Sequence, residues 1–149
     1  MMRERVSVED ARRILRRVPA DKSFWLCTNK YLRNLKELAE ALVDIDNDTF
    51  RYHVNRDKND FENWIKNVVG DKRLSREIAR IKTKETLKKK IAERFNELSA
   101  IVKAHRHRAE TKKAAARRKR KRRKKSAAAR TRNRRRRSAK GRESRRRNT

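Results

Sequence analysis

The stretch "DFENWIKNVVGD", residues 60–71, carries the strongest helical signal in the chain. Its apolar residues follow the i, i+3, i+4, i+7, i+8 spacing that gathers side chains on one face of a helix. Gly70 stands where the end of a helix commonly needs a left-handed residue, and Asp71 can cap the helix that follows. The stretch therefore predicts a helix over about 60–69 that buries one face, and with it a mainly α fold.

Cap and turn residues divide the sequence on either side of this stretch into further helices. Ser7 and Asn34 precede amphipathic stretches, and Pro19 ends the first of them. Thr83 opens the longest stretch, in which large apolar residues recur along one stripe. The predicted helices cover about 8–18, 34–42, 50–54, 60–69, 72–81 and 83–105.

The segment "SFWLCTNKYL", residues 23–32, is the one β-like part of the sequence. It is rich in aromatic and branched residues, which favour strands. Asn29 lies inside it, and asparagine tolerates the left-handed conformation that a tight turn requires. The segment therefore predicts two short strands paired as a small hairpin.

The charge of the chain is concentrated at its C-terminal end. Residues 106–149 contain 24 basic and 2 acidic side chains, a net charge of +22, whereas residues 1–105 contain 25 and 17, a net charge of +8. No large apolar residue follows Val102, so the basic part cannot offset its ordering entropy by burial. We therefore expect a small helical domain over 1–105 and an Arg/Lys-rich tail over 106–149 that is disordered when free.

The tail nevertheless has the composition of a helix former. No glycine or proline occurs from Asp71 to Lys140, and Ala, Arg and Lys all have high helix propensity. Repulsion between like charges opposes the helix in free solution. We expect the long C-terminal helix to fray after about His105 in the free protein, and to extend when phosphates neutralise the tail.

Several pieces of the sequence resemble one known domain family. The pieces are an F-x-L hairpin, "LKELAEAL", "F-x-x-HVN", "KNDF-x-NWI" and "GD-x-x-L", spread over residues 24–81. They are similar to a small prokaryotic, mostly archaeal, domain family of unknown function. The resemblance implies a helical domain and carries no activity. The basic tail lies outside the resembling region and is interpreted as an addition, similar in composition to the tails of protamines and linker histones.

The segment "HVNRDKNDFENW", residues 53–64, gathers polar side chains next to an indole. One interpretation is a binding pocket. The other is that Asn59 or Asp60 caps the following helix while His53 and Asn55 fix the loop before it, and cap and turn residues cluster at helix junctions in any case. The second interpretation is the one we favour.

No recognisable catalytic, metal or cofactor motif occurs in the sequence. Asp44, Asp46 and Asp48 alternate as in a calcium loop, but the glycine and the closing glutamate of that loop are missing. His105, His107 and the single cysteine, Cys27, match no zinc spacing. We therefore expect no enzyme, no metal and no cofactor.

The remaining candidate is the tail, whose self-repulsion an anionic polymer would relieve. The sequence predicts that its basic side chains bind nucleic acid through phosphates. The candidate residues are Arg106, Arg108, Lys112, Lys113, Arg117, Arg118, Lys119, Arg120, Lys121, Arg122, Arg123, Lys124, Lys125, Arg130, Arg132, Arg134, Arg135, Arg136, Arg137, Lys140, Arg142, Arg145, Arg146 and Arg147.

Arginine outnumbers lysine in the tail by 17 to 7, and arginine suits phosphate contacts and narrow minor grooves. No aromatic residue follows Phe95, so the tail cannot stack single-stranded bases on rings. Sequence therefore favours a sequence-nonspecific, DNA-compacting protein of nucleoid or chromatin type that binds double-stranded DNA.

The main alternative is a ribosome-associated protein that binds structured RNA. A third possibility is a targeting signal, because "KRKRRKK", residues 119–125, would pass as a nuclear signal, although the tail is far longer than such a signal needs. Membrane binding ranks last, since the tail has no residues that would insert into lipid. We expect a cytoplasmic, nucleoid-associated protein, and sequence leaves open a homodimer through the helical domain.

Overall fold

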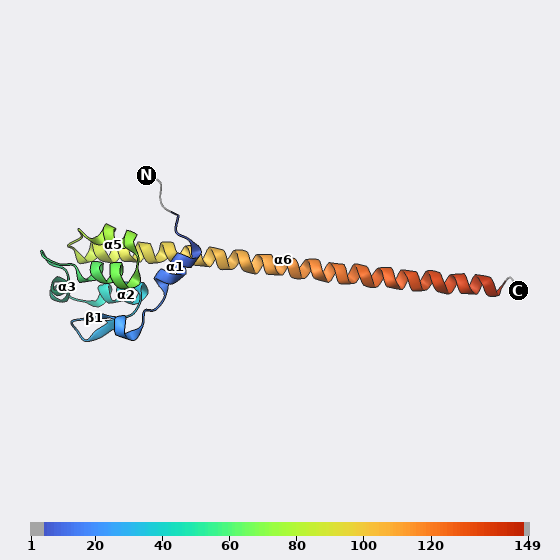
Figure 1. The fold of residues 1–149 in the computed structure, drawn as a ribbon, viewed down its shortest axis with the longest axis horizontal. Helices are drawn as coiled ribbons and strands as arrows, with labels where there is room; N and C mark the ends of the chain where they lie inside the picture. Colours follow the sequence, from blue (N-terminus) through green and yellow to red (C-terminus); the bar gives the residue numbers. More distant parts are fainter. Residues whose placement is uncertain (1–4, 148–149) are drawn as a thin grey trace. The chain divides into compact units, whose positions relative to one another are not determined.

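The computed structural model describes residues 5–147 of the chain, which divide into two units, Met1–His105 and Arg106–Thr149. The first unit contains most of the secondary-structure elements (Figure 1). In chain order, they are α1 (Val8–Leu15), η1 (Ala20–Lys22), β1 (Phe24–Leu26), β2 (Lys30–Leu32), α2 (Leu35–Asp44), α3 (Asn47–His53), α4 (Asp60–Trp64), η2 (Ile65–Val69), α5 (Lys72–Ile78) and the beginning of α6 (Lys84–Arg146).

Side-chain caps start five of these helices. In each case an oxygen of the capping side chain accepts the backbone N–H of the residue three positions on, at 2.7–3.1 Å. Such a bond satisfies one of the N–H groups that a helix start leaves without a partner. The caps predicted at Ser7, Asn34 and Asp71 are thus confirmed, and of the alternatives Asn59 and Asp60 the cap is Asn59. The fifth cap is Asp46.

The helix predicted over 60–69 is present, but its hydrogen-bonding pattern changes from α-helical to π-helical halfway along. Its first part, α4, is α-helical, and its second part, η2, is a π-helical segment. The N–H groups of Gly70 and Asp71 both donate to the carbonyl of Ile65, at 2.8 and 3.2 Å. Gly70 ends the segment at φ +81°, the left-handed conformation expected of it.

Replacing Gly70 with alanine is expected to destabilise the fold by about 1–2 kcal/mol, because a Cβ disfavours this left-handed backbone. The added Cβ would also stand 2.8 Å from Nη1 of Arg13, but that group ends a flexible side chain and can move. Urea unfolding would measure the loss. Gly70→Asn should cost less, since asparagine tolerates positive φ, and equal costs for the two variants would contradict the backbone explanation.

The predicted hairpin is also confirmed. β1 and β2 are antiparallel, with Phe24 opposite Leu32 and Trp25 opposite Tyr31. Asn29 has φ 59° and donates its N–H to the carbonyl of Leu26 at 2.9 Å, which closes a three-residue loop. Because side chains alternate along a strand, one face of the hairpin enters the core and the other faces outward.

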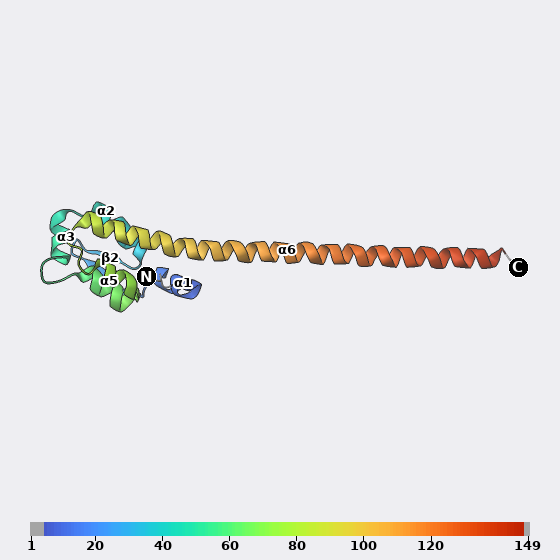
Figure 2. The same ribbon diagram turned by 90° about the horizontal axis from the view of Figure 1, so that it is seen from above.

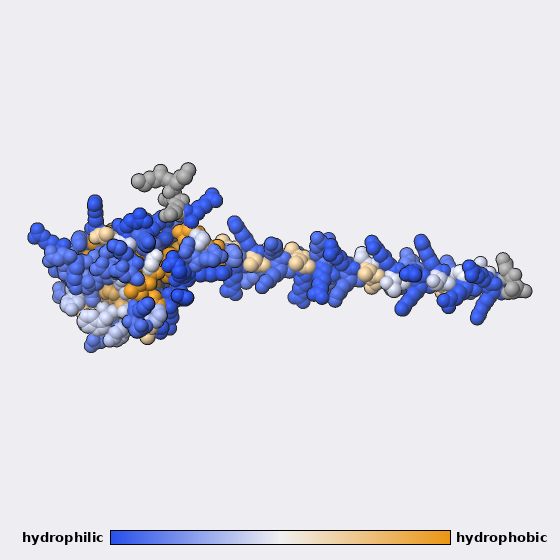
Figure 3. Space-filling view, in the orientation of Figure 1, coloured by the Kyte–Doolittle hydropathy of each residue, from blue (hydrophilic) through white to orange (hydrophobic). Residues whose placement is uncertain are grey.

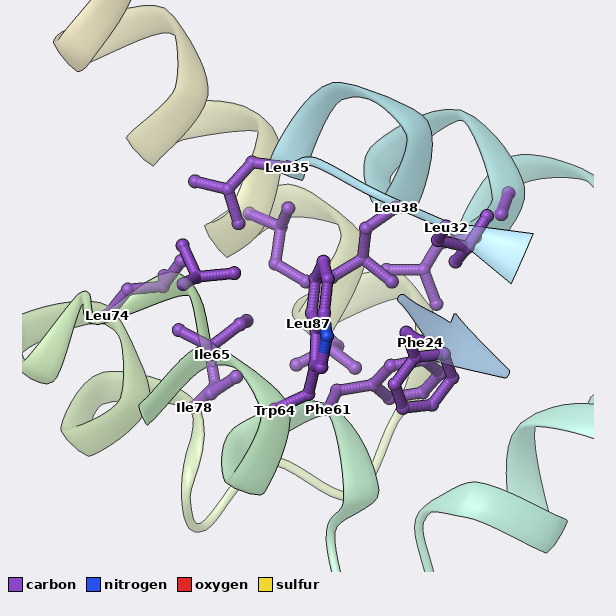
Figure 4. Close-up of a cluster of buried hydrophobic side chains, with 14 of the residues drawn as sticks. Phe24, Leu32, Leu35, Leu38, Phe61, Trp64, Ile65, Leu74, Ile78 and Leu87 are labelled. Atoms are coloured by element: carbon purple, nitrogen blue, oxygen red, sulfur yellow. The ribbon is translucent and has the colours of Figure 1, made fainter. Parts of the chain in front are cut away.

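The core of the first unit collects apolar side chains from the hairpin and from α1 to α6. Figure 4 shows Leu38, Phe61, Ile78 and Leu87 directed toward one another from four different helices. Three residues of α6, Leu87, Ile91 and Leu98, are completely buried. The beginning of α6 is therefore fixed by packing in the first unit.

The second unit, from Arg106 onward, differs from the sequence expectation of a disordered, frayed tail. It is helical as far as Arg146, and α6 is continuous in both views (Figures 1 and 2). The costly step in helix formation is the first turn, and packing at Leu87–Leu98 already provides one. Each further residue then only extends an existing helix, and the run of good helix formers outweighs the repulsion between their charges.

Candidate nucleic-acid interface

All the described basic side chains of the second unit are exposed to solvent. Every described side chain from residue 103 to 147 is exposed, and this range contains all 24 candidate residues predicted from sequence. Figure 3 shows hydrophilic side chains projecting along this segment, interrupted by short paler bands. The structure therefore brings 23 of the predicted residues together on a single helix, and Arg147 directly follows its end.

These side chains surround the helix and form no one-sided stripe. Successive residues of an α-helix are rotated by 100°, so the nine consecutive basic residues Arg117–Lys125 make two and a half turns. Positive charge therefore points in every direction around this part of the axis. At 1.5 Å per residue, the helical part of the second unit is about 60 Å long, comparable with roughly two turns of duplex.

Little of this charge can be neutralised within the unit. Its two carboxylates are Glu110 and Glu143, against 24 basic residues. Arg106 donates to Glu110 at 3.0 Å, and both side chains are largely exposed, so the pair is weak. The unit thus keeps a strong positive potential that attracts anions.

Hollows along the described part of the second unit, residues 106–147, are open to solvent. The hollows found along it, such as the one lined by Thr131, Arg135 and Ser138, lie between neighbouring side chains of the same exposed helix. A cavity that excludes water requires walls from more than one element. The shape of this unit suits contact with an extended partner.

Several basic residues of the first unit contact polar side chains of the same unit. Arg17 lies 3.3 Å from Glu37, and Arg13 lies 3.2 Å from Asp10. Arg12 contacts the ring of His105 at 3.3 Å. The two carboxylate pairs reduce the local positive potential, whereas the contact between Arg12 and the imidazole ring does not.

The polar segment 53–64 serves the fold. Asn59 caps α4 and also donates from its side chain to the carbonyl of Ile78 at 3.1 Å, while Asn55 accepts two N–H groups of its own turn. The indole of Trp64 donates to the carbonyl of Lys22 at 2.9 Å. The favoured interpretation, capping and loop fixation, is thus confirmed.

His53, the first residue of this segment, is 2% exposed. Its Nδ1 lies 3.0 Å from Oδ2 of Asp60, and its Nε2 accepts the N–H of Cys27 at 3.1 Å. Accepting at Nε2 leaves the proton of the neutral ring on Nδ1, directed at Asp60. Burial lowers the pKa of His53 below its ordinary value of 6.5, although the Asp60 carboxylate opposes the shift. The neutral ring therefore joins the hairpin loop to α3 and α4.

Stability is expected to fall as pH drops below about 6.5. An unfolded His53 takes up a proton near that pH, whereas the folded one does so only at lower pH, so acid favours the unfolded state. The free energy of unfolding should decrease by up to about 1.4 kcal/mol per pH unit between 6.5 and the lowered pKa. Chemical unfolding at a series of pH values measures this, and His53→Gln should remove the slope. A slope that persists in His53→Gln would assign it to other groups.

One buried ion pair was not anticipated from sequence. Arg94, 4% exposed, donates from Nε and Nη2 to the two carboxylate oxygens of Asp71, 2% exposed, at 2.8 and 3.2 Å. Its Nη1 also donates to Glu97 at 3.0 Å. Burial alone would lower the pKa of Arg94, but the two carboxylates outweigh it and raise the pKa. The pair joins α6 to the capped start of α5.

Within residues 5–147, no group of three or more His, Cys, Asp and Glu side chains is placed to hold a metal ion. Asp46, the central residue of the calcium-like pattern, caps α3. No helix in the same range is both long and apolar enough to cross a membrane.

Comparison with known families gives one match. A family model described as a family of unknown function, DUF5752, matches residues 17–123. The match includes the region of resemblance at 24–81 and continues beyond it. It ends inside the run Arg117–Lys125, so it takes in the first part of the tail that sequence placed outside the family. No curated protein and no solved structure matches the chain.

Proposed function

Because the chain belongs to DUF5752, a family of unknown function, we propose its function from its own surface. We propose a non-enzymatic protein that binds nucleic acid without sequence preference and compacts double-stranded DNA by neutralising its phosphates. The single observation that carries this proposal is the exposed helix of the second unit, which carries 23 of that unit's 24 basic residues.

The affinity comes from phosphate contacts. Each Lys or Arg that meets a phosphate releases a condensed counterion, which favours binding without any choice of sequence. The residues that contribute most are Arg117–Lys125 and Arg134–Arg137, where basic side chains are consecutive, and Arg145–Arg147 extend the reach. Guanidinium groups predominate, and they can contact phosphate in a bidentate way.

A duplex suits this helix better than a single strand does. The tail has no ring on which bases could stack, so its contacts are with the backbone alone. Because charge surrounds the axis at Arg117–Lys125, a duplex on one side leaves basic groups free on the other side. Those groups can meet a second duplex, and bridging of this kind compacts DNA. The protein would then act in the cytoplasm, on the nucleoid.

The test is a salt series with full-length protein, in which duplex DNA and a structured RNA hairpin compete at equal salt. If half of the 24 basic groups neutralise phosphates, log K against log[salt] should have a slope of about −11 for duplex DNA. DNA should bind at least as well as RNA. A shallow slope would overturn phosphate neutralisation, and a clear preference for RNA would replace DNA compaction with structured-RNA binding.

A further inference from the structure

Three exposed aromatic side chains gather on the outer face of the first unit. They are Trp25 of β1, Tyr31 of β2 and Tyr52 of α3, exposed by 41%, 64% and 52%. We call them the aromatic patch. Of the four large hydrophobic residues exposed in the described range, three belong to this patch, and the fourth, Val43, lies on α2. Their exposure is therefore concentrated in one place.

The backbone brings these rings together. Trp25 and Tyr31 are direct partners across the hairpin, so their side chains leave the same face side by side. The ring of Tyr52 meets Trp25 edge to face, with centroids 6.2 Å apart and planes at 78°. The buried His53 ring supports both, at 6.3 Å from Trp25 and 5.0 Å from Tyr52. Contacts with each other and with His53 hold the rings of Trp25 and Tyr52 in place, and Tyr31 stands beside Trp25 with most of its surface exposed.

Positive charge borders the patch. The ammonium group of Lys58 lies 4.8 Å from the centre of the Tyr52 ring, and it also contacts Asp60 at 2.8 Å. Arg51 precedes Tyr52 on α3, and its side chain is exposed. Rings flanked by basic groups match a nucleotide, which has a flat base and a phosphate.

We propose that the aromatic patch binds unpaired nucleotides by stacking their bases on Trp25, Tyr31 and Tyr52. This inference rests on the proposed function and extends it, because the rings supply what the tail lacks. The full chain would then hold paired regions through the tail and loops or single strands through the patch. Self-association through the patch is disfavoured by the like charge of two copies, each with a net charge of +30.

Tryptophan fluorescence of the full chain tests the proposal directly. The chain has two tryptophans, of which Trp64 is 7% exposed. Titration with a 12-nucleotide oligothymidylate at raised salt, where phosphate contacts weaken, should quench the emission of Trp25. Trp25→Phe keeps a ring for stacking but removes this signal. The remaining Trp64 emission should then be unaffected by the oligonucleotide.

Affinity variants give a second measurement. Tyr31→Ala and Tyr52→Ala should each weaken oligothymidylate binding at raised salt about tenfold, and leave duplex binding within about twofold. Val43→Ala, which also removes an exposed apolar side chain, is the matched control and should change neither. Unfolding curves for each variant verify that the fold is kept.

Two outcomes overturn the inference. One is that oligothymidylate does not quench the emission of Trp25 and that Tyr31→Ala and Tyr52→Ala both bind it as tightly as the unchanged chain does. The other is a concentration-dependent dimer in sedimentation that the tyrosine variants dissociate, which would make the patch a contact between two copies. Neither outcome affects the duplex salt slope, so failure here is distinguishable from failure of the proposed function.

Discussion

Replacing the nine residues Arg117–Lys125 with glutamine is expected to weaken the binding of duplex DNA about 1,000-fold at about 0.15 M salt. If half of these groups contact phosphate, four to five contacts are lost, and the slope of log K against log[salt] should become shallower by about 4. Glutamine keeps a long polar side chain with good helix propensity, so the helix itself should remain. A fluorescence-anisotropy titration at several salt concentrations measures both quantities.

A charge-preserving variant is the matched control. Changing only the arginines of Arg117–Lys125 to lysine keeps every positive charge and removes the guanidinium groups, so the salt slope should not change. A chain ended at residue 105 should lose nearly all duplex affinity. If that shortened chain still bound duplex DNA tightly, the first unit would be the main DNA-binding part and the tail would contribute little affinity.

Replacing Arg94 with methionine is expected to destabilise the protein by about 3–5 kcal/mol. The substitution leaves the buried carboxylate of Asp71 without its bidentate partner, and an uncompensated buried charge is costly. Total stabilities of small domains are about 5–15 kcal/mol, so this is a large share. Urea unfolding monitored by circular dichroism gives the value.

Two further variants distinguish the loss of the buried ion pair from an unspecific loss of stability. Arg73→Ala removes an arginine that also contacts Glu97, but at a partly exposed position, and should cost only about 1 kcal/mol or less. Combining Asp71→Asn with Arg94→Met removes both charges and should be less harmful than the sum of the two single changes. Additive losses would show that the two side chains do not act as a pair.

Local chemistry made much of this fold predictable. The caps at Ser7, Asn34 and Asp71, the turn at Asn29 and the helix end at Gly70 each depend on a few neighbouring residues. Because such features need no distant partner, sequence reveals them directly.

Features that depend on distant partners were not predictable in the same way. Arg94 looks like any other basic residue of an amphipathic helix until Asp71, 23 positions away, meets it. The aromatic patch needs Tyr52 of α3 to lie against the hairpin, which spacing does not reveal. For residues 106–146 the sequence predicted a helix only in the bound state, because it reveals the repulsion between like charges but not the packed turns that start α6.

The distribution of charge around Arg117–Lys125 has a consequence for motion on DNA. A helix with basic side chains on one face only would bind a duplex best in a single rotational orientation, and a free-energy barrier would separate that orientation from the others. Here rotation about the helix axis exchanges one set of basic groups for an equivalent set, so many bound arrangements have nearly the same free energy. If the tail binds duplex DNA as proposed, such degeneracy would favour binding entropically and would let the protein roll and slide along the backbone without first dissociating.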